Sequence, residues 1–154
     1  MTSRLLAPLA SPNDPDASNS ESQPRHRVVI IDPREERRAI TNLYVERCGL
    51  LTVVGSAGNL GDAQTQIRTE RADVALVEIQ MPVTQGLDTI GALRDQFPDL
   101  RIVVCSFHND SATREAARLR GADGYLTKPL QTDDLVVLVE SPRSASGADP
   151  IEGD

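Results

Sequence analysis

Two carboxylates and one ammonium stand at points of the sequence where apolar runs end. Glu78 follows the run Val74–Val77, and Asp32 follows Val28–Ile31. A continuous apolar run of this length, bounded by turn residues, is typical of a strand buried on both faces of a parallel sheet. Ligands and chemistry collect just beyond the carboxyl ends of such strands. Glu78 and Asp32 are therefore the first candidates for a site, together with Lys128 in a loop after a later, shorter strand.

Amphipathic segments separate the apolar runs, so strands and helices are expected to alternate along the chain. Five strands alternating with five helices predict right-handed βαβ units and an α/β fold with a doubly wound parallel sheet. The flavodoxin-like strand order 2-1-3-4-5 is expected, and in it Asp32 and Glu78 face each other across the crevice. The expected strands are 28–31, 51–54, 74–78, 102–105 and 124–126. The expected helices are 33–48, a weak one around Ala63 and Ile67, 86–97, 111–120 and 132–140.

Local signals set the ends of the first helix. Pro33 is expected at its first position, and Gly49 is expected to stop it. Residues 55–61 are expected to form a loop, and a Met81–Pro82 turn is expected after Glu78. Three apolar residues recur at helical spacing in the first helix: Ile40, Leu43 and Tyr44.

Composition limits the classes of function. The chain has 154 residues, 39% hydrophobic and 25% charged, which suits one modest globular domain. Its net charge is −7, and no Lys/Arg run appears, so direct binding to nucleic acid is not expected. Cys48 and Cys105 show no metal-ligand spacing, and a reduced, cytoplasmic setting is expected. No signal peptide or membrane span is predicted.

Polar segments flank the expected domain. Residues 1–25 and 141–154 are rich in Ser, Pro, Gly and acidic residues, and they contain too few apolar side chains to offset the entropy of ordering. Both are predicted to be disordered tails. The folded unit is predicted to span residues 27–140.

Several of these segments together resemble a known family, the receiver domain of two-component response regulators. The resemblance covers residues 27–140. It rests on marks in the family's order and spacing: Ile30-Ile31-Asp32, Glu78-Ile79-Gln80-Met81-Pro82 with Gly86, Ser106, and Gly121-Ala122-Asp123-Gly124-Tyr125-Leu126-Thr127-Lys128-Pro129. Val53-Val54-Gly55 also looks like receivers that carry a helix-turn-helix output.

The resemblance implies a role for each matching residue. In the family, a carboxylate attacks a phosphoryl group that a divalent metal and a lysine hold. By position, Lys128 would be the cation, Ser106 the hydroxyl that bonds the phosphate, and Tyr125 the aromatic side chain whose rotamer reports the switch. Asp32 would be one of two acidic residues at the metal site. The chain is thus expected to be a signalling module and not an enzyme.

Two departures from the family pattern bear on this chemistry. Glu78 stands where the family has its aspartate phosphoacceptor, and Pro33 stands where it has a second acidic residue. One methylene displaces the carboxylate by roughly 1.5 Å, and a misplacement of about 1 Å can cost on the order of 100-fold in rate. With one acidic residue lost, no resident metal is expected, and only weak Mg²⁺ binding through Asp32 and Glu78. The longer Glu78 arm is expected to pair with Lys128 and to reach toward Ser106.

These departures favour an atypical, stand-alone pseudo-receiver that acts through protein–protein contacts without phosphorylation. The resemblance names a sensor histidine kinase or another signalling protein as partner. It also names the face formed by 111–120, 124–126 and 132–140 as a docking surface, through which a homodimer is an option. Two alternatives stay open: a working phosphorelay receiver with an unusual site, and a receiver-like module that binds a small molecule in the crevice.

Overall fold

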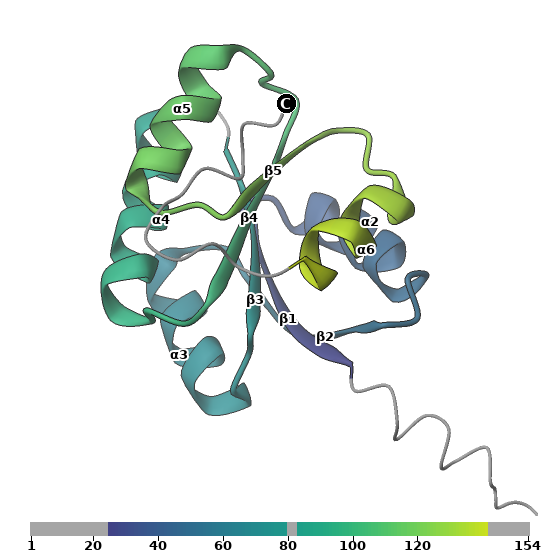
Figure 1. The fold of residues 1–154 in the computed structure, drawn as a ribbon. Helices are drawn as coiled ribbons and strands as arrows, with labels where there is room; N and C mark the ends of the chain where they lie inside the picture. Colours follow the sequence, from purple (N-terminus) through teal and green to yellow (C-terminus); the bar gives the residue numbers. More distant parts are fainter. Residues whose placement is uncertain (1–24, 80–82, 142–154) are drawn as a thin grey trace, which may run out of the picture.

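The computed structural model describes residues 25–79 and 83–141, and those residues form a five-stranded sheet covered on both faces by helices (Figure 1). All strand pairs are parallel, and the strand order is β2-β1-β3-β4-β5. The predicted α/β fold and strand order are therefore confirmed. The predicted Met81–Pro82 turn lies outside the described residues, and so do the predicted tails apart from Arg25 and Ser141.

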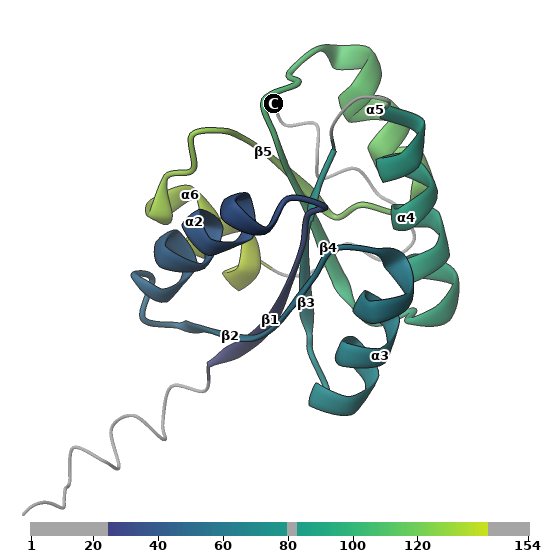
Figure 2. The same ribbon diagram turned by 180° about the vertical axis from the view of Figure 1, so that it is seen from behind.

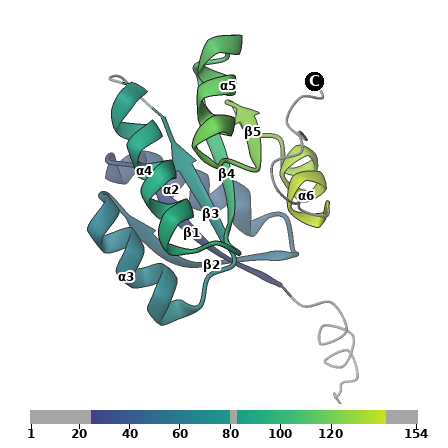
Figure 3. The ribbon, with the colours of Figure 1, turned by 60° about the vertical axis from the view of Figure 1, so that its left-hand side comes forward.

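The strands are β1 (His26–Ile31), β2 (Leu51–Ala57), β3 (Val74–Glu78), β4 (Arg101–Ser106) and β5 (Gly124–Thr127). The helices are α2 (Glu35–Glu46), α3 (Leu60–Glu70), α4 (Val83–Gln96), α5 (Ser111–Arg120) and α6 (Thr132–Glu140). Helices α2 and α6 cover one face of the sheet, and α3, α4 and α5 cover the other (Figures 1 and 2). In Figure 3, α4 lies between α3 and α5 in the second layer.

The alternation of side chains along the strands divides the core into two halves. Val29 and Ile31 of β1 pack in the half that includes buried residues of α3, α4 and α5. Val28 and Ile30 pack in the half that includes buried residues of α2 and α6. Because side chains alternate between faces with a period of two, this division also decides where a residue at a strand end points. β3 is buried over its whole length, as the apolar run predicts.

The first helix starts later than predicted. It begins at Glu35, with Arg34 as an extended N-cap, so the expectation that Pro33 occupies the first helical position is wrong. The Asp32 side chain explains the shift, because its Oδ1 accepts a hydrogen bond from the Arg34 backbone N–H at 2.9 Å and closes a turn over Pro33. Gly49, at φ +76°, follows the helix end as expected.

The buried face of α2 is not the one that its apolar residues suggest. Thr41 and Val45 are buried, whereas Ile40 is 54% exposed. Leu43 is also exposed, at 65%. The apolar spacing thus predicts the helix correctly, but two of the three residues that indicate it lie on its outer side.

Two other boundaries move. The expected loop at 55–61 is short, because β2 continues through Ala57 and α3 starts at Leu60. The Asn59 side chain caps α3 by accepting a hydrogen bond from the Asp62 backbone N–H at 2.9 Å. Helix α4 begins at Val83, earlier than the expected Gly86.

Two glycines of α4 offer a matched test of the packing beneath the site. A Cβ on Gly86 would lie 2.8 Å from Cγ1 and 3.2 Å from the backbone Cα of Ile79, at the end of β3. We expect Gly86→Ala to lower the free energy of unfolding by about 1–3 kcal/mol, because the added Cβ meets both the fully buried side chain and the backbone of Ile79. At Gly91 the nearest atom is 3.8 Å away, so Gly91→Ala is expected to raise it by about 0.5–1 kcal/mol through helix propensity. Urea denaturation measures both, and equal effects would contradict this packing.

Candidate functional site

The two carboxylates that the sequence singles out come together at the carboxyl ends of β1 and β3. Ile31 pairs with Val77 in the parallel register, so the next residues, Asp32 and Glu78, are neighbours. Both are buried, with 1% and 8% of their surface exposed. Glu78 has the strand parity of Leu76, which sends its side chain to the α2–α6 face of the sheet.

Lys128 meets both carboxylates from the loop after β5. Its Nζ lies 2.5 Å from Oε1 of Glu78 and 4.0 Å from Oδ2 of Asp32. The Lys128 side chain is only 10% exposed, and that of Glu78 only 4%. The ion pair between Glu78 and Lys128 that the sequence predicts is therefore present and is shielded from water.

A second cation, which sequence reasoning missed, approaches Glu78 from α2. Nη1 of Arg37 lies 3.9 Å from Oε2 of Glu78. The neighbouring Arg38 donates a hydrogen bond from Nη1 to the Asp32 carbonyl at 2.7 Å. A signal for both was available: they lie in the first turns of the helix after Asp32, and that end of the helix faces the carboxyl ends of the strands.

The protonation of Glu78 reflects competing effects. Burial raises the pKa of this carboxyl above its ordinary value. The Lys128 ammonium opposes that shift, the Asp32 carboxylate adds to it, and the Arg37 guanidinium opposes it. Desolvation is the largest of these causes, so the pKa of Glu78 is raised overall even though both cations oppose the shift.

Ser106 and Tyr125 are engaged with backbone near the site. The Ser106 hydroxyl donates to the Ile79 carbonyl at 2.8 Å and accepts from the His108 backbone N–H at 3.0 Å. The Tyr125 hydroxyl donates to the His108 carbonyl at 2.5 Å. The expected approach of Glu78 to Ser106 is thus not found, because the Ser106 hydroxyl ties the end of β3 to the loop after β4. Tyr125 is 6% exposed, and burial raises the pKa of its hydroxyl.

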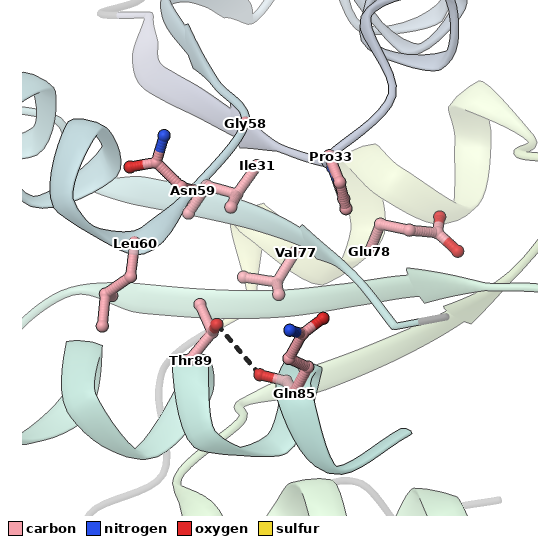
Figure 4. A pocket seen from close by; sticks show the side chains of 10 residues that line it. Ile31, Pro33, Gly58, Asn59, Leu60, Val77, Glu78, Gln85 and Thr89 are labelled. Carbon is pink, nitrogen blue, oxygen red and sulfur yellow. Dashed lines mark hydrogen bonds between the residues drawn. The ribbon is translucent and has the colours of Figure 1, made fainter. Parts of the chain in front are cut away.

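A pocket of about 380 Å³ opens on the other side of the same strand ends. Ile31 and Val77 line it, with Asn59, Gln85 and Thr89 as neutral polar neighbours. Glu78 also lines this pocket, and Figure 4 shows its carboxylate directed away from Ile31, Val77 and Thr89. Strand parity again explains the arrangement, because Ile31 and Val77 face α3 and α4 while Glu78 faces α2 and α6.

Among the described residues, the side chains at these strand ends do not supply the donor set of a resident Mg²⁺ ion. Mg²⁺ requires several oxygen donors in near-octahedral geometry. Within the described ranges 25–79 and 83–141, no group of three or more His, Cys, Asp and Glu side chains could hold a metal ion. The two available carboxylates are both directed toward the Lys128 ammonium, and Pro33 supplies no side-chain oxygen.

No helix of the described chain has the length and apolar character to cross a membrane.

These features define a class: a doubly wound α/β domain whose strand ends hold a buried carboxylate–lysine cluster. Residues 28–140 match the family described as response regulator receiver domain. The chain therefore belongs to the receiver domains of two-component signalling, which are signalling modules and not enzymes.

Individual relatives support this membership. The chain is 30% identical over 122 residues to the transcriptional regulatory protein MctR of Rhizobium johnstonii, covering 77% of this chain and 56% of MctR. It is 32% identical over 109 residues to the nitrate/nitrite response regulator protein NarL of Escherichia coli K12, covering 71% and 50%. The chain thus spans about half the length of these curated relatives.

Solved structures agree with the fold. The signal receiver domain of the putative response regulator NarL from Mycobacterium tuberculosis superimposes with a TM-score of 0.66 at 28% identity, covering 76% of this chain and 94% of that one. A response regulator from Thermotoga maritima gives a TM-score of 0.66 at 27% identity, covering 75% and 95%.

Proposed function

We propose that this receiver is atypical and transmits its signal through protein–protein contacts without being phosphorylated. The observation that carries the proposal is the ion pair of Glu78 with Lys128, whose Nζ lies 2.5 Å from Oε1, and the family resemblance assigns Glu78 to the phosphoacceptor position. In the family mechanism, the lysine must bind an incoming phosphoryl group, and here its ammonium is already engaged by the carboxylate that would have to attack. The lysine and the acceptor carboxylate therefore bind each other, and neither is available to a phosphoryl group.

The charge balance of the site supports a permanent state. The Lys128 and Arg37 cations face the Glu78 and Asp32 carboxylates, so the negative charge of the two carboxylates is already balanced without a metal. A dianionic phosphoryl donor would have to displace one of these contacts. We propose that the pair holds one conformation that a partner recognises, with a sensor histidine kinase or another signalling protein as that partner. We also propose a cytoplasmic setting and no direct contact with nucleic acid.

The family's docking face corresponds here to α5, β5 and α6. Leu119 and Val137 are its large exposed apolar side chains among the described residues, at 70% and 64% exposure. We propose this face as the contact for a partner or a second copy. Size-exclusion chromatography with light scattering distinguishes these two options, because it measures the mass of the protein in solution. A monomer at all concentrations would exclude contact with a second copy.

The wild-type chain is expected to carry no phosphoryl group after incubation with Mg²⁺ and acetyl phosphate. Intact mass spectrometry reads the result directly, and the E78D/P33D variant of the same chain is measured beside it for comparison. A stable adduct on the wild type would contradict the proposal and establish the alternative, a working phosphorelay receiver with an unusual site.

A second candidate is supported by the pocket of about 380 Å³ between the strand ends and α4, which is of the size that small ligands occupy. Its lining combines apolar side chains such as Ile31 and Val77 with polar ones such as Asn59, Gln85 and Glu78, so an uncharged polar small molecule would suit it. A ligand-dependent rise in Tm on screening uncharged metabolites would favour this function. Loss of that rise in Thr89→Leu, which fills the pocket, would locate the binding.

A further inference from the structure

An apolar groove of about 280 Å³ lies beside the ion pair, on the α2–α6 side of the sheet. Ile40 and Tyr44 of α2 form one wall. Phe107, after β4, and Pro129 and Leu130, after β5, line the rest. Arg37 and Lys128 also line it, so the groove borders the cations that bind Glu78.

The groove collects side chains that would gain by being covered. Ile40 is 54% exposed and Phe107 is 62% exposed, and Leu43 on the same helix is 65% exposed. The remaining large exposed apolar residues of the described chain, Leu119 and Val137, lie on α5 and α6. Contiguous exposed apolar side chains of this kind mark a docking surface more often than scattered ones do.

The chain itself contains a segment suited to this groove. Within residues 1–24, the large aliphatic side chains are Leu5, Leu6 and Leu9, all in the first ten residues. The spacer 11–24 is polar and acidic. Residues 142–154, at the other end, offer one large apolar side chain, Ile151, among acidic residues. The amino-terminal segment therefore matches an apolar groove better than the carboxyl-terminal one.

The length of the spacer matches the distance to be covered. The described chain starts at Arg25, at the amino end of β1, and the groove lies at the carboxyl ends of the strands. β1 has six residues and so spans about 20 Å. A Gly/Ser-like chain of 14 residues, the length of the spacer 11–24, would have a root-mean-square extension of about 20 Å, and the prolines of this spacer favour a somewhat longer one. Tethering is most effective when these two lengths agree, with effective concentrations in the millimolar range.

We propose that the segment Leu5–Leu9 docks in the groove formed by α2, Phe107 and Leu130 of the same molecule. The docked segment covers the apolar side chains of a groove that Arg37 and Lys128 also line. The proposal goes beyond the function proposed above, because it does not depend on whether Glu78 accepts a phosphoryl group.

Paramagnetic relaxation in the full-length protein tests the docking. A nitroxide is attached at position 3 in a Ser3→Cys, Cys48→Ser background. The remaining Cys105 is 3% exposed, and burial raises its pKa to about 12, so it stays unlabelled. We expect strong line broadening at the amides of Ile40 and Phe107, and little at Leu119 on α5.

Substitutions in the segment give the decisive comparison. In an L5S/L6S/L9S variant, the relaxation enhancement at Ile40 and Phe107 is expected to fall several-fold. A matched spacer variant, S11A/S18A/S20A, is expected to keep it. Equal broadening with and without the leucines overturns the proposal. Broadening of an isotope-labelled, nitroxide-free protein mixed with nitroxide-labelled protein also overturns it, because the occupant would then be a second copy.

Discussion

Replacing Lys128 with methionine is expected to lower the free energy of unfolding by about 3–5 kcal/mol, because it leaves a buried carboxylate without its main partner. The Glu78 side chain is 4% exposed, so water cannot take over the role of the ammonium. Arg37 lies 3.9 Å from Glu78 and is 35% exposed, which limits its ability to compensate. Urea denaturation of the wild type and the variant measures the loss.

A double variant separates the destabilisation caused by an unpaired buried charge from the net contribution of the Glu78–Lys128 ion pair to stability. In E78M/K128M, two apolar side chains of similar length replace the two ions, and most of the lost stability is expected to return, since buried ion pairs are often no more stabilising than well-packed apolar residues. If E78M/K128M is no more stable than K128M, the loss reflects packing of the lysine stem instead of the unpaired charge.

The effect of Lys128→Met is also expected to depend on pH. Burial raises the pKa of Glu78, and removing the ammonium removes the main influence that lowers it. A carboxyl whose pKa is raised on folding contributes stability that is fully present below its unfolded pKa, and this contribution is lost as the pH rises through the folded pKa. The penalty of K128M is therefore expected to be small near pH 4 and larger at pH 8. A loss of stability in K128M that grows toward acid pH would contradict the assignment of Glu78 as the carboxylate left unpaired.

The strands and helices were predictable because hydrophobic periodicity indicates them directly. The apolar run before Glu78 indicates a strand buried on both faces, and β3 is buried throughout. The turn at Pro33 was not predictable in this way, because it depends on a hydrogen bond from the Arg34 N–H to the Asp32 side chain. Neither was the buried face of α2, because Ile40 and Leu43 form the helix equally well when they face outward.

In the candidate site too, positions that follow from the sequence pattern were predictable, and contacts that depend on side-chain packing were not. Strand ends and loop position place Asp32, Glu78 and Lys128 together, and this follows from the register of parallel strands. Arg37 was missed because three arginines lie close together after Asp32, and only the rotation of α2 decides which one faces Glu78. The hydrogen bond of Ser106 to Ile79 depends on a rotamer, which spacing cannot specify.

The double substitution Glu78→Asp and Pro33→Asp is expected to enable autophosphorylation. Glu78→Asp withdraws the carboxylate by roughly 1.5 Å from Lys128, and this frees the ammonium for a phosphoryl oxygen. Pro33→Asp returns a second acidic oxygen donor for Mg²⁺ beside Asp32. Pro33 is exposed and lies outside α2, so the change is expected to leave the fold intact. With positioning effects of about 100-fold per ångström, the double variant is expected to react at least 100-fold faster than the wild type.

Intact mass after timed incubation with Mg²⁺ and acetyl phosphate follows the gain. Each single variant is expected to fall between the wild type and E78D/P33D, because acceptor position and metal binding contribute separately. The matched control E78N/P33D keeps the second acidic residue but has an amide at the acceptor, and it is expected to show no adduct. An adduct on that control would place the reaction at another residue. If E78D/P33D also stays unmodified, the second cation, Arg37, becomes the next candidate, because its guanidinium would still occupy the approach to the acceptor.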